Sequence, residues 1–336
     1  MILSLLACAL FQSGTMKIGS IELFGQSGLE TAHFLKNLSV HPGDSYRWKN
    51  MAAVMQVIDE DVRREYGKPA TDVAPVGFDE NGAMIIFIGL PGPTVRKLLP
   101  RPWPHGSAKL DSEGLALYKS FGDTLLPALQ RGGGREDDSQ GYALFSDPEL
   151  RAIQMRMRTY ALAHDALIRK VLDTSTEALH RQAAAELLGY ARHSKAQMDC
   201  LMRATADPDD TVRNNAVRAI GVLVKSDAKI AKSLPPTRFI AMVCSGTWTD
   251  RNKGSMVLQE LSKWRKPLVL SEIRRTALPS LIEMARWRSG HSNDPRAILG
   301  RVAGIEEKPL QQMIERRDLA GILRAIAQLK AKALNQ

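Results

Sequence analysis

The spacing of hydrophobic residues changes along the chain, from strand-like near the N-terminus to helical further on. Over residues 18–24, apolar and polar residues partly alternate, which predicts a β-strand closed by Gly25. From residue 147 onward, apolar positions such as Leu162, Ala166 and Val171 recur at steps of three and four, as on amphipathic helices. The pattern therefore predicts a small α/β module followed by a long helical region.

The N-terminal module is predicted to have the element order β-α-α-β-β. After the first strand, helices are expected over residues 28–38 and from Asp44 or Ser45 to Val62, separated by a turn at residues 41–44, His-Pro-Gly-Asp. Two further strands are expected over residues 71–78 and 83–90. An Asn-Gly pair at 81–82 favours a hairpin between them.

This element order resembles the polypeptide-transport-associated (POTRA) domain of outer-membrane assembly and division proteins. The motif that carries the resemblance is residues 18–25, Ile-Gly-Ser-Ile-Glu-Leu-Phe-Gly, with the turn at 41–44. The resemblance implies an extracytoplasmic location for the module, residues 16–92, and interaction through an exposed strand edge that accepts an incoming strand. The alternative is that the module packs on the helical region as a cap and binds nothing.

A connector over residues 93–146 separates the two regions. Closely spaced prolines at 91–93 and 100–104 end the module, because proline fits neither helix interiors nor central strands. One helix is expected near 113–129, followed by a flexible surface loop that starts with three glycines at 132–134. Asp137 and Asp138 in this loop are expected to be solvated, since no further oxygen ligand follows at a fixed spacing.

The helical region matches itself after thirty-two residues. Residues 180–189, His-Arg-Gln-Ala-Ala-Ala-Glu-Leu-Leu-Gly, align with 212–221, Val-Arg-Asn-Asn-Ala-Val-Arg-Ala-Ile-Gly, so Arg181 aligns with Arg213. Small, apolar and basic residues recur together at helical spacing. A two-helix unit that repeats in this way predicts a solenoid of stacked helix pairs.

Residues 207–220, Asp-Pro-Asp-Asp-Thr-Val-Arg-Asn-Asn-Ala-Val-Arg-Ala-Ile, resemble a HEAT repeat of the bacterial type. The resemblance implies an armadillo-like, right-handed superhelical α-solenoid over residues 147–336, with the last helices as a cap. It also implies a ladder between adjacent repeats, formed by Asp207, Arg213 and the aligned Arg181. Asp207, and Ser175 or Thr176 one repeat earlier, are further expected to cap helix N-termini.

The whole chain, including residues 248–253 and 277–287, is also similar to exported bacterial HEAT-repeat proteins of the acidobacterial type. That group has no assigned function. The similarity implies architecture and compartment, and no mechanism.

The first eleven residues form an uncharged apolar run. It is too short to span a bilayer as a helix, and it is similar to the hydrophobic region of a secretory signal. We therefore expect residues 1–15 to be a signal segment of a protein exported to the periplasm or cell surface, without a transmembrane helix. One alternative is a lipid anchor at Cys8, because residues 5–8 resemble a lipobox. Another is translation from Met16 and a cytoplasmic protein.

Positive charge is concentrated near the C-terminal end. Residues 251–336 contain 17 Lys and Arg against 8 Asp and Glu, whereas residues 1–250 contain 29 against 28. Such a region is typical of binding to an anionic partner, although solvated helix faces would give the same count. The candidate partner-binding residues are Arg251, Lys253, Arg286, Trp287 and Arg288.

The sequence has no phosphate loop, metal-ligand cluster, Ser-His-Asp phrase or dinucleotide fingerprint. We therefore assign no catalytic, cofactor or metal residues, and expect a non-enzymatic protein-interaction scaffold that binds protein partners through the repeat face and a strand edge. The alternative is a basic HEAT-like nucleic-acid-binding protein or DNA glycosylase-type enzyme in the cytoplasm, in which arginines alternate with Trp248, Trp264 and Trp287.

Overall fold

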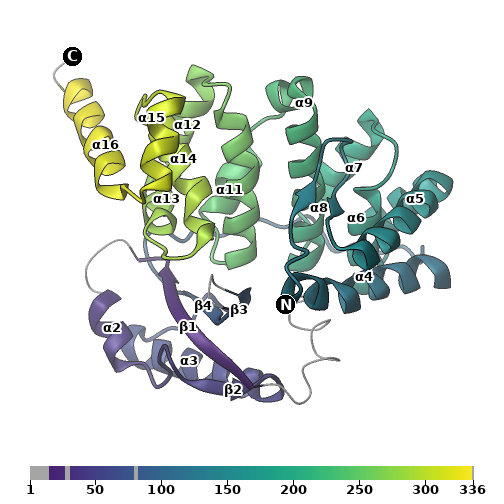
Figure 1. Ribbon diagram of the computed structural model, residues 1–336, viewed down its shortest axis with the longest axis horizontal. Coiled ribbons are helices and arrows are strands. Elements are labelled where there is room, and N and C mark those ends of the chain that lie inside the picture. The colour runs from purple at the N-terminus through teal and green to yellow at the C-terminus, as the bar shows by residue number, and fades with distance from the viewer. Residues whose placement is uncertain (1–14, 27–30, 79–81, 335–336) are drawn as a thin grey trace. The chain divides into compact units, whose positions relative to one another are not determined.

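A computed structural model describes residues 15–26, 31–78 and 82–334 (Figure 1). The expected signal segment, the lipidation site at Cys8 and most of the expected hairpin turn at 79–82 lie outside these residues. By their contacts the described residues form two compact units. Unit 1 contains residues 99–234, and unit 2 contains the residues up to 98 together with those from 235 onward.

Unit 2 contains a four-stranded sheet with the order β2-β1-β4-β3. The long strand β1 (Thr15–Phe24) pairs in parallel with the central strand β4 (Met84–Gly89) and antiparallel with the short β2 (Ser45–Arg47). Strand β3 (Asp72–Phe78) pairs antiparallel with β4 and forms one edge of the sheet, and β2 forms the other. The predicted order of elements is therefore confirmed, with β2 as an additional short strand.

Two helices and a 3-10 turn connect β1 to β3. They are α2 (Thr31–Asn37), η2 (Trp48–Asn50) and α3 (Met51–Tyr66). On α3, Val54, Ile58 and Val62 recur every four residues and are all buried, which is the apolar stripe that the sequence predicts. Gly67 ends the helix in the left-handed conformation.

Gly25 closes β1, as predicted, and the structure shows why only glycine fits there. Its φ is +102°, and an added Cβ would lie 2.1 Å from the carbonyl oxygen of Leu90. The Leu90 amide in turn donates to the carbonyl of Phe24. The end of β1 therefore approaches the end of β4 closely, and any side chain at Gly25 would push the two strands apart.

The C-terminal helices of unit 2 form stacked pairs. Helices α10 (Thr237–Val243) and α11 (Trp248–Ser262) pack together, as do α13 (Leu278–Ala285) and α14 (Asn293–Val302). Helix α14 also contacts α11, α15 (Glu307–Glu315) and α16 (Leu319–Leu334). Between the two pairs lies α12 (Pro267–Thr276), which the sequence analysis missed, and the 3-10 turn η3 (Gly290–Ser292) connects α13 to α14.

The sheet and these helices belong to one unit because they share a core. Every residue of β4 is buried, which requires cover on both of its faces. Helix α3 packs on β3, while α11 contacts β3 and β4, and α13 contacts β1 (Figure 1). Residues 16–92 thus pack against C-terminal helices instead of forming a compact unit of their own.

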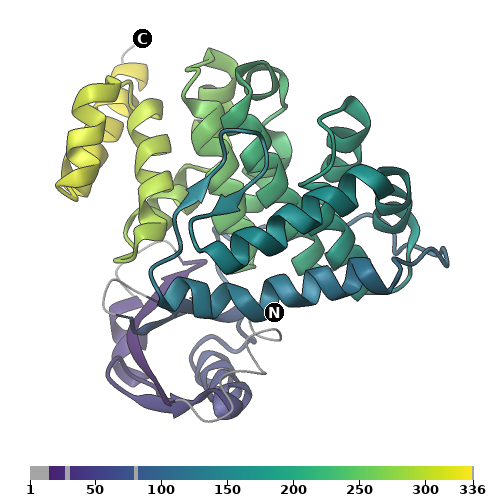
Figure 2. The same cartoon turned by 45° about the vertical axis from the view of Figure 1, so that its right-hand side comes forward.

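Unit 1 is built from a helical stack and a small β-ribbon. Helix α4 (Ser112–Gln130) lies beside α5 (Pro148–Thr174), and the ribbon between them pairs β5 (Glu136–Asp137) with β6 (Leu144–Phe145) (Figure 2). Helix α6 (Ala178–Leu188) pairs with α5, and α7 (Lys195–Ala204) pairs with α8 (Asp210–Ser226). The short α9 (Ala228–Ser233) follows.

Two predicted helix caps in unit 1 are wrong. The N-cap of α8 is Asp209, whose carboxylate accepts the amides of Thr211 and Val212, whereas Asp207 is buried in the turn. The residue before α6 is Glu177, and it makes no side-chain cap. Proline-acid phrases place an N-cap only to within a residue or two, because several neighbouring acids satisfy the same rule.

Among the described helices, none combines the length and hydrophobicity needed to cross a bilayer. Cys200 and Cys244 are buried free thiols. Burial raises the pKa of Cys200 to about 12, so this thiol stays protonated at neutral pH.

Candidate functional site

The turn before α8 holds a buried ion pair. One edge of the Arg181 guanidinium donates to Asp207 in a bidentate way, from Nη2 to Oδ1 at 2.9 Å and from Nε to Oδ2 at 3.0 Å, and both side chains are 0% exposed. Arg101 donates to the same carboxylate at 2.6 Å. The indole ring of Trp103 lies 5.2 Å from the Arg181 guanidinium carbon. Asp207 therefore joins segments of unit 1 and has no free lone pair to offer a substrate.

A second set of bonds repeats along the stack. Arg181 donates to the carbonyl of Ser175 at 2.9 Å, and Arg213 donates to the carbonyl of Asp207 at 2.9 Å, six residues before it in each case. Each arginine thus satisfies a carbonyl in the turn before its own helix. The Arg181–Asp207 pair thus joins two turns of the stack. The bonds of Arg213 to the carbonyls of residues 207 and 208 lie within the turn before its own helix, so the ladder role that the HEAT resemblance implies for Arg213 stays a prediction.

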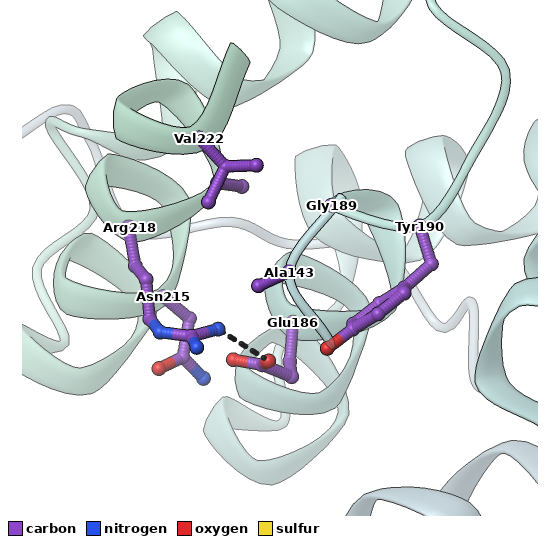
Figure 3. A pocket seen from close by; sticks show the side chains of 8 residues that line it. Ala143, Glu186, Gly189, Tyr190, Asn215, Arg218 and Val222 are labelled. Carbon is purple, nitrogen blue, oxygen red and sulfur yellow. Dashed lines mark hydrogen bonds and ion pairs between the residues drawn. The ribbon is translucent and has the colours of Figure 1, made fainter. Parts of the chain in front are cut away.

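A shallow pocket lies between α6 and α8 (Figure 3). Its accessible volume is about 10 Å³, enough for roughly one water molecule. Glu186 and Arg218 face each other across it, with Nη1 and Oε1 3.3 Å apart. The remaining lining is mixed, and its members are Ala143, Gly189, Tyr190, Asn215, Ala219 and Val222.

Two polar groups of this pocket, Tyr190 and Arg218, each keep one protonation state near neutral pH. Burial raises the pKa of Tyr190 above its ordinary value, so its phenol stays neutral. Burial would lower the pKa of Arg218, but the carboxylates of Glu136 and Glu186 outweigh it and raise that pKa. Neither Tyr190 nor Arg218 therefore exchanges a proton readily at this pH.

Ion pairs connect the segment of the β5–β6 ribbon to α8. Glu136 pairs with Arg218, and Asp138 pairs with Lys225 at 3.0 Å. The guanidinium carbon of Arg218 lies 5.7 Å from the Phe145 ring, and Phe145 itself is buried. The expectation that Asp138 is solvated is therefore corrected, because it binds a base of α8, whereas Asp137 is exposed as expected.

Unit 2 contains a comparable buried arginine. Arg251 is 0% exposed, donates to the carbonyl of Ser245 at 2.7 Å and pairs with Glu283 at 3.0 Å. Glu283 also accepts the amide of Gly25 at 3.1 Å and the hydroxyl of Thr94 at 2.8 Å. As a correction, Arg251 is no partner-binding residue: its charge is neutralised inside the unit.

Trp287 is also an interior residue. It is 1% exposed, and its indole N–H donates to the carbonyl of Leu23 in β1 at 3.0 Å. Its ring centroid lies 4.9 Å from that of Phe87, which also contacts Trp248 and His291. The assignment of Trp287 to a partner surface is therefore corrected, and its function is to anchor the sheet to the helices.

The other candidate residues lie at or near the surface. Arg286 and Arg288 flank Trp287, and both are exposed. Lys253 is half-buried, and its charge contributes to the lowered pKa of His291. Of the three tryptophans in the nucleic-acid hypothesis, only Trp264 is exposed, at 40%. The nucleic-acid alternative therefore loses two of the three tryptophan rings on which bases could stack.

Glu283 and Asp72 are the site residues that the sequence analysis missed. Asp72 accepts the amide of Trp248 at the start of α11 at 2.7 Å. Glu283 stands in the apolar run Leu-Ile-Glu-Met-Ala at 281–285, and a lone acid within such a run is a signal of a buried ion pair. Within residues 15–26, 31–78 and 82–334, no cluster of three or more His, Cys, Asp or Glu could hold a metal ion.

One family model and one solved structure are similar to parts of this chain. The HEAT-repeat family model matches residues 198–226, which include most of α7 and all of α8. A crystal structure of computationally designed armadillo repeat proteins for modular peptide recognition is similar with a TM-score of 0.37 and 15% identity, covering 55% of this chain and 86% of that chain. No curated protein matched. Residues 198–226, which contain Asp207 and Arg213, are thus similar to a HEAT repeat.

Proposed function

We propose that this protein is a non-enzymatic protein-interaction scaffold of the bacterial periplasm or cell surface. The observation that carries the proposal is how its buried polar groups are used. Asp207 and Glu283 are each saturated by an arginine and further donors within their own unit. Groups held in this way stabilise a stack and leave the outer helix faces for binding. HEAT repeats commonly serve as such scaffolds.

The helix faces support the proposal better than the strand edge does. Leu162 on α5 is 46% exposed and Leu268 on α12 is 83% exposed, and both can contact a partner. The edge strand β3 contains Pro75, which has no N–H to donate to an incoming strand. We therefore place partner binding on the helices, with the β3 edge in a minor role.

Site-specific photo-crosslinking tests the scaffold. A photoreactive residue at Leu162 or Leu268 of the full chain, in its native host, is expected to give discrete crosslinked proteins. The matched control is the exposed Lys68 at the end of α3, where we expect none. Equal products at all three positions, or none anywhere, would contradict a scaffold that binds through its helix faces.

The export part of the proposal rests on the apolar run at residues 1–11 and the small residues that follow it. Mass spectrometry of the mature N-terminus tests it. Removal of about fifteen residues, or a lipid on Cys8, agrees with export. An intact N-terminus, or one at Met16 in a cytoplasmic fraction, contradicts it.

A further inference from the structure

A short acidic segment of unit 1 lies alongside α8 of the same unit (Figure 1). Residues 132–140, Gly-Gly-Gly-Arg-Glu-Asp-Asp-Ser-Gln, contain three acids and one arginine. Glu136 pairs with Arg218 of α8, and Asp138 pairs with Lys225 of the same helix, with Oδ2 and Nζ 3.0 Å apart. We call residues 132–140 the acidic arm.

The acidic arm is weakly attached compared with the strand that follows it. It begins at Gly132 and ends before Gly141, and both glycines have a left-handed φ, +79° and +77°. Its strand, β5, pairs with β6 over two residues, and most of the arm is exposed. Leu144 and Phe145 of β6 are buried, so they stay in the core when the arm moves. Partly exposed ion pairs add little to stability, which makes the arm a segment that opens easily.

The contact between the arm and α8 is incomplete. Among the residues that the structure describes, no donor reaches Oδ1 of Asp138, although this oxygen is buried. A buried acceptor without a donor costs free energy and weakens the contact that contains it. Lys225 remains 42% exposed beside the arm. A segment that satisfies the same bases without burying an unpaired oxygen would therefore compete with the arm.

We propose that the face of α8 with Arg218 and Lys225 binds an extended acidic segment of a partner protein, and that the acidic arm competes for this face within the chain. The inference rests on the proposed scaffold function and adds the chemistry of its partner. The two bases are seven residues apart, about 10 Å along one helix face. Glu136 and Asp138 are two residues apart in an extended strand, about 7 Å, and the long basic side chains span the difference. A partner segment with two acids at a similar spacing fits the same bases, because the arm already shows that this face accepts carboxylates on an extended backbone.

Fluorescence anisotropy with the purified full chain tests the inference. The probe is a labelled peptide that repeats Gly-Glu-Ser-Asp-Gly, at low salt so that charge attraction is not screened. The test variant, Glu136→Gln with Asp138→Asn, releases the arm but keeps the shape of its side chains, and Arg218 keeps its pair with Glu186.

The control variant, Asp123→Asn with Asp199→Asn, changes the net charge equally, because each of these acids forms a surface ion pair elsewhere in unit 1. A third variant adds Lys225→Gln to the test variant. Circular dichroism checks that all three variants fold.

We expect the test variant to bind the peptide at least about tenfold more tightly than the parent protein, and the control to stay within about threefold of it. Adding Lys225→Gln should reverse most of the gain. No gain in the test variant, an equal gain in the control, or a gain that survives Lys225→Gln would overturn the inference. Tighter binding of a DNA duplex of equal charge, with the same dependence on Lys225, would assign the face to nucleic acid instead.

Hydrogen exchange distinguishes release of the arm from damage to the fold. In the test variant we expect faster exchange in the arm and unchanged exchange in α8. Faster exchange throughout α8 would show that the arm is a structural part of the stack, which also contradicts the inference. Crosslinks at Leu162 and Leu268 do not depend on the arm, so their presence would leave the scaffold proposal standing if the inference fails.

Discussion

Each unit contains one buried arginine with a similar set of bonds, but the two arginines join different parts of the structure. Arg181 in unit 1 and Arg251 in unit 2 each donate to a carbonyl six residues earlier and to one carboxylate. In unit 1 that carboxylate, Asp207, belongs to the turn of the next helix pair. In unit 2 it is Glu283, which also receives donors from the loop after β1 and from Thr94. A buried arginine–carboxylate pair therefore joins adjacent helix pairs in unit 1 and joins helices to the sheet in unit 2.

The strongest test of this comparison removes the two carboxylates. Asp207→Ala and Glu283→Ala each leave a guanidinium buried without its counter-ion, so each should destabilise its own unit by about 3–5 kcal/mol. Hydrogen exchange read by mass spectrometry reports the units separately. We expect Glu283→Ala to release the amides of β1 and β4 in addition to those of α11 and α13, and Asp207→Ala to affect α6–α8.

Glu315→Ala is a control for both variants, because Glu315 is exposed and accepts one hydrogen bond from Gln311 at the surface. It should change stability by less than about 0.5 kcal/mol. If the exchange of β1 and β4 responded equally to Asp207→Ala, the sheet would not depend on Glu283 in the way described.

A second test uses acid to loosen unit 2. Burial, with a smaller contribution from the charge of Lys253, lowers the pKa of His291 from 6.5 to about 4. Because the unfolded chain binds the proton more readily, stability is complete above pH 6.5 and is lost as the pH falls towards 4. The difference between the two pKa values corresponds to about 3 kcal/mol. Urea unfolding followed by tryptophan fluorescence at several pH values measures it.

His291→Gln isolates this contribution, because glutamine does not titrate. Glu22 changes stability in the opposite direction: burial raises its pKa, so its contribution weakens as the pH rises through and above 4.5. The difference between the parent protein and His291→Gln cancels that effect. A pH profile unchanged by the substitution would show that the aromatic cluster of Phe87, Trp248 and His291 opens before His291 is protonated.

A third, smaller effect concerns Trp287. Trp287→Phe keeps an aromatic ring beside Phe87 but removes the hydrogen bond to the Leu23 carbonyl. We expect a loss of about 1–2 kcal/mol from unit 2, since a buried carbonyl loses its donor. Trp103→Phe in unit 1 is the matched control, because Trp103 is 51% exposed and its stacking on Arg181 needs no indole N–H. Equal losses would show that ring size, and not the hydrogen bond, is what matters.

The sequence predicted local structure and the repeat best. The alternation over 18–24, the apolar stripe of α3 and the self-match of 180–189 with 212–221 depend on neighbours in the chain, and each corresponds to an observed element. The last helices expected from the sequence correspond to α15 and α16. The N-cap residues of the helices were predicted less accurately, because nearby acids such as Asp207 and Asp209 fit the same local sequence rule.

Only the tertiary structure decided which charged and aromatic residues are available to a partner. Arg251, Trp287, Arg286 and Arg288 are alike in sequence context, yet the first two are buried against the sheet and the last two are exposed. The sheet that buries them is formed more than 150 residues earlier in the chain. By itself the sequence thus determined the helices, the repeat and the excess of positive charge. Which of those charges stay in solvent depends on long-range packing, because burial is set by neighbours that no local pattern encodes.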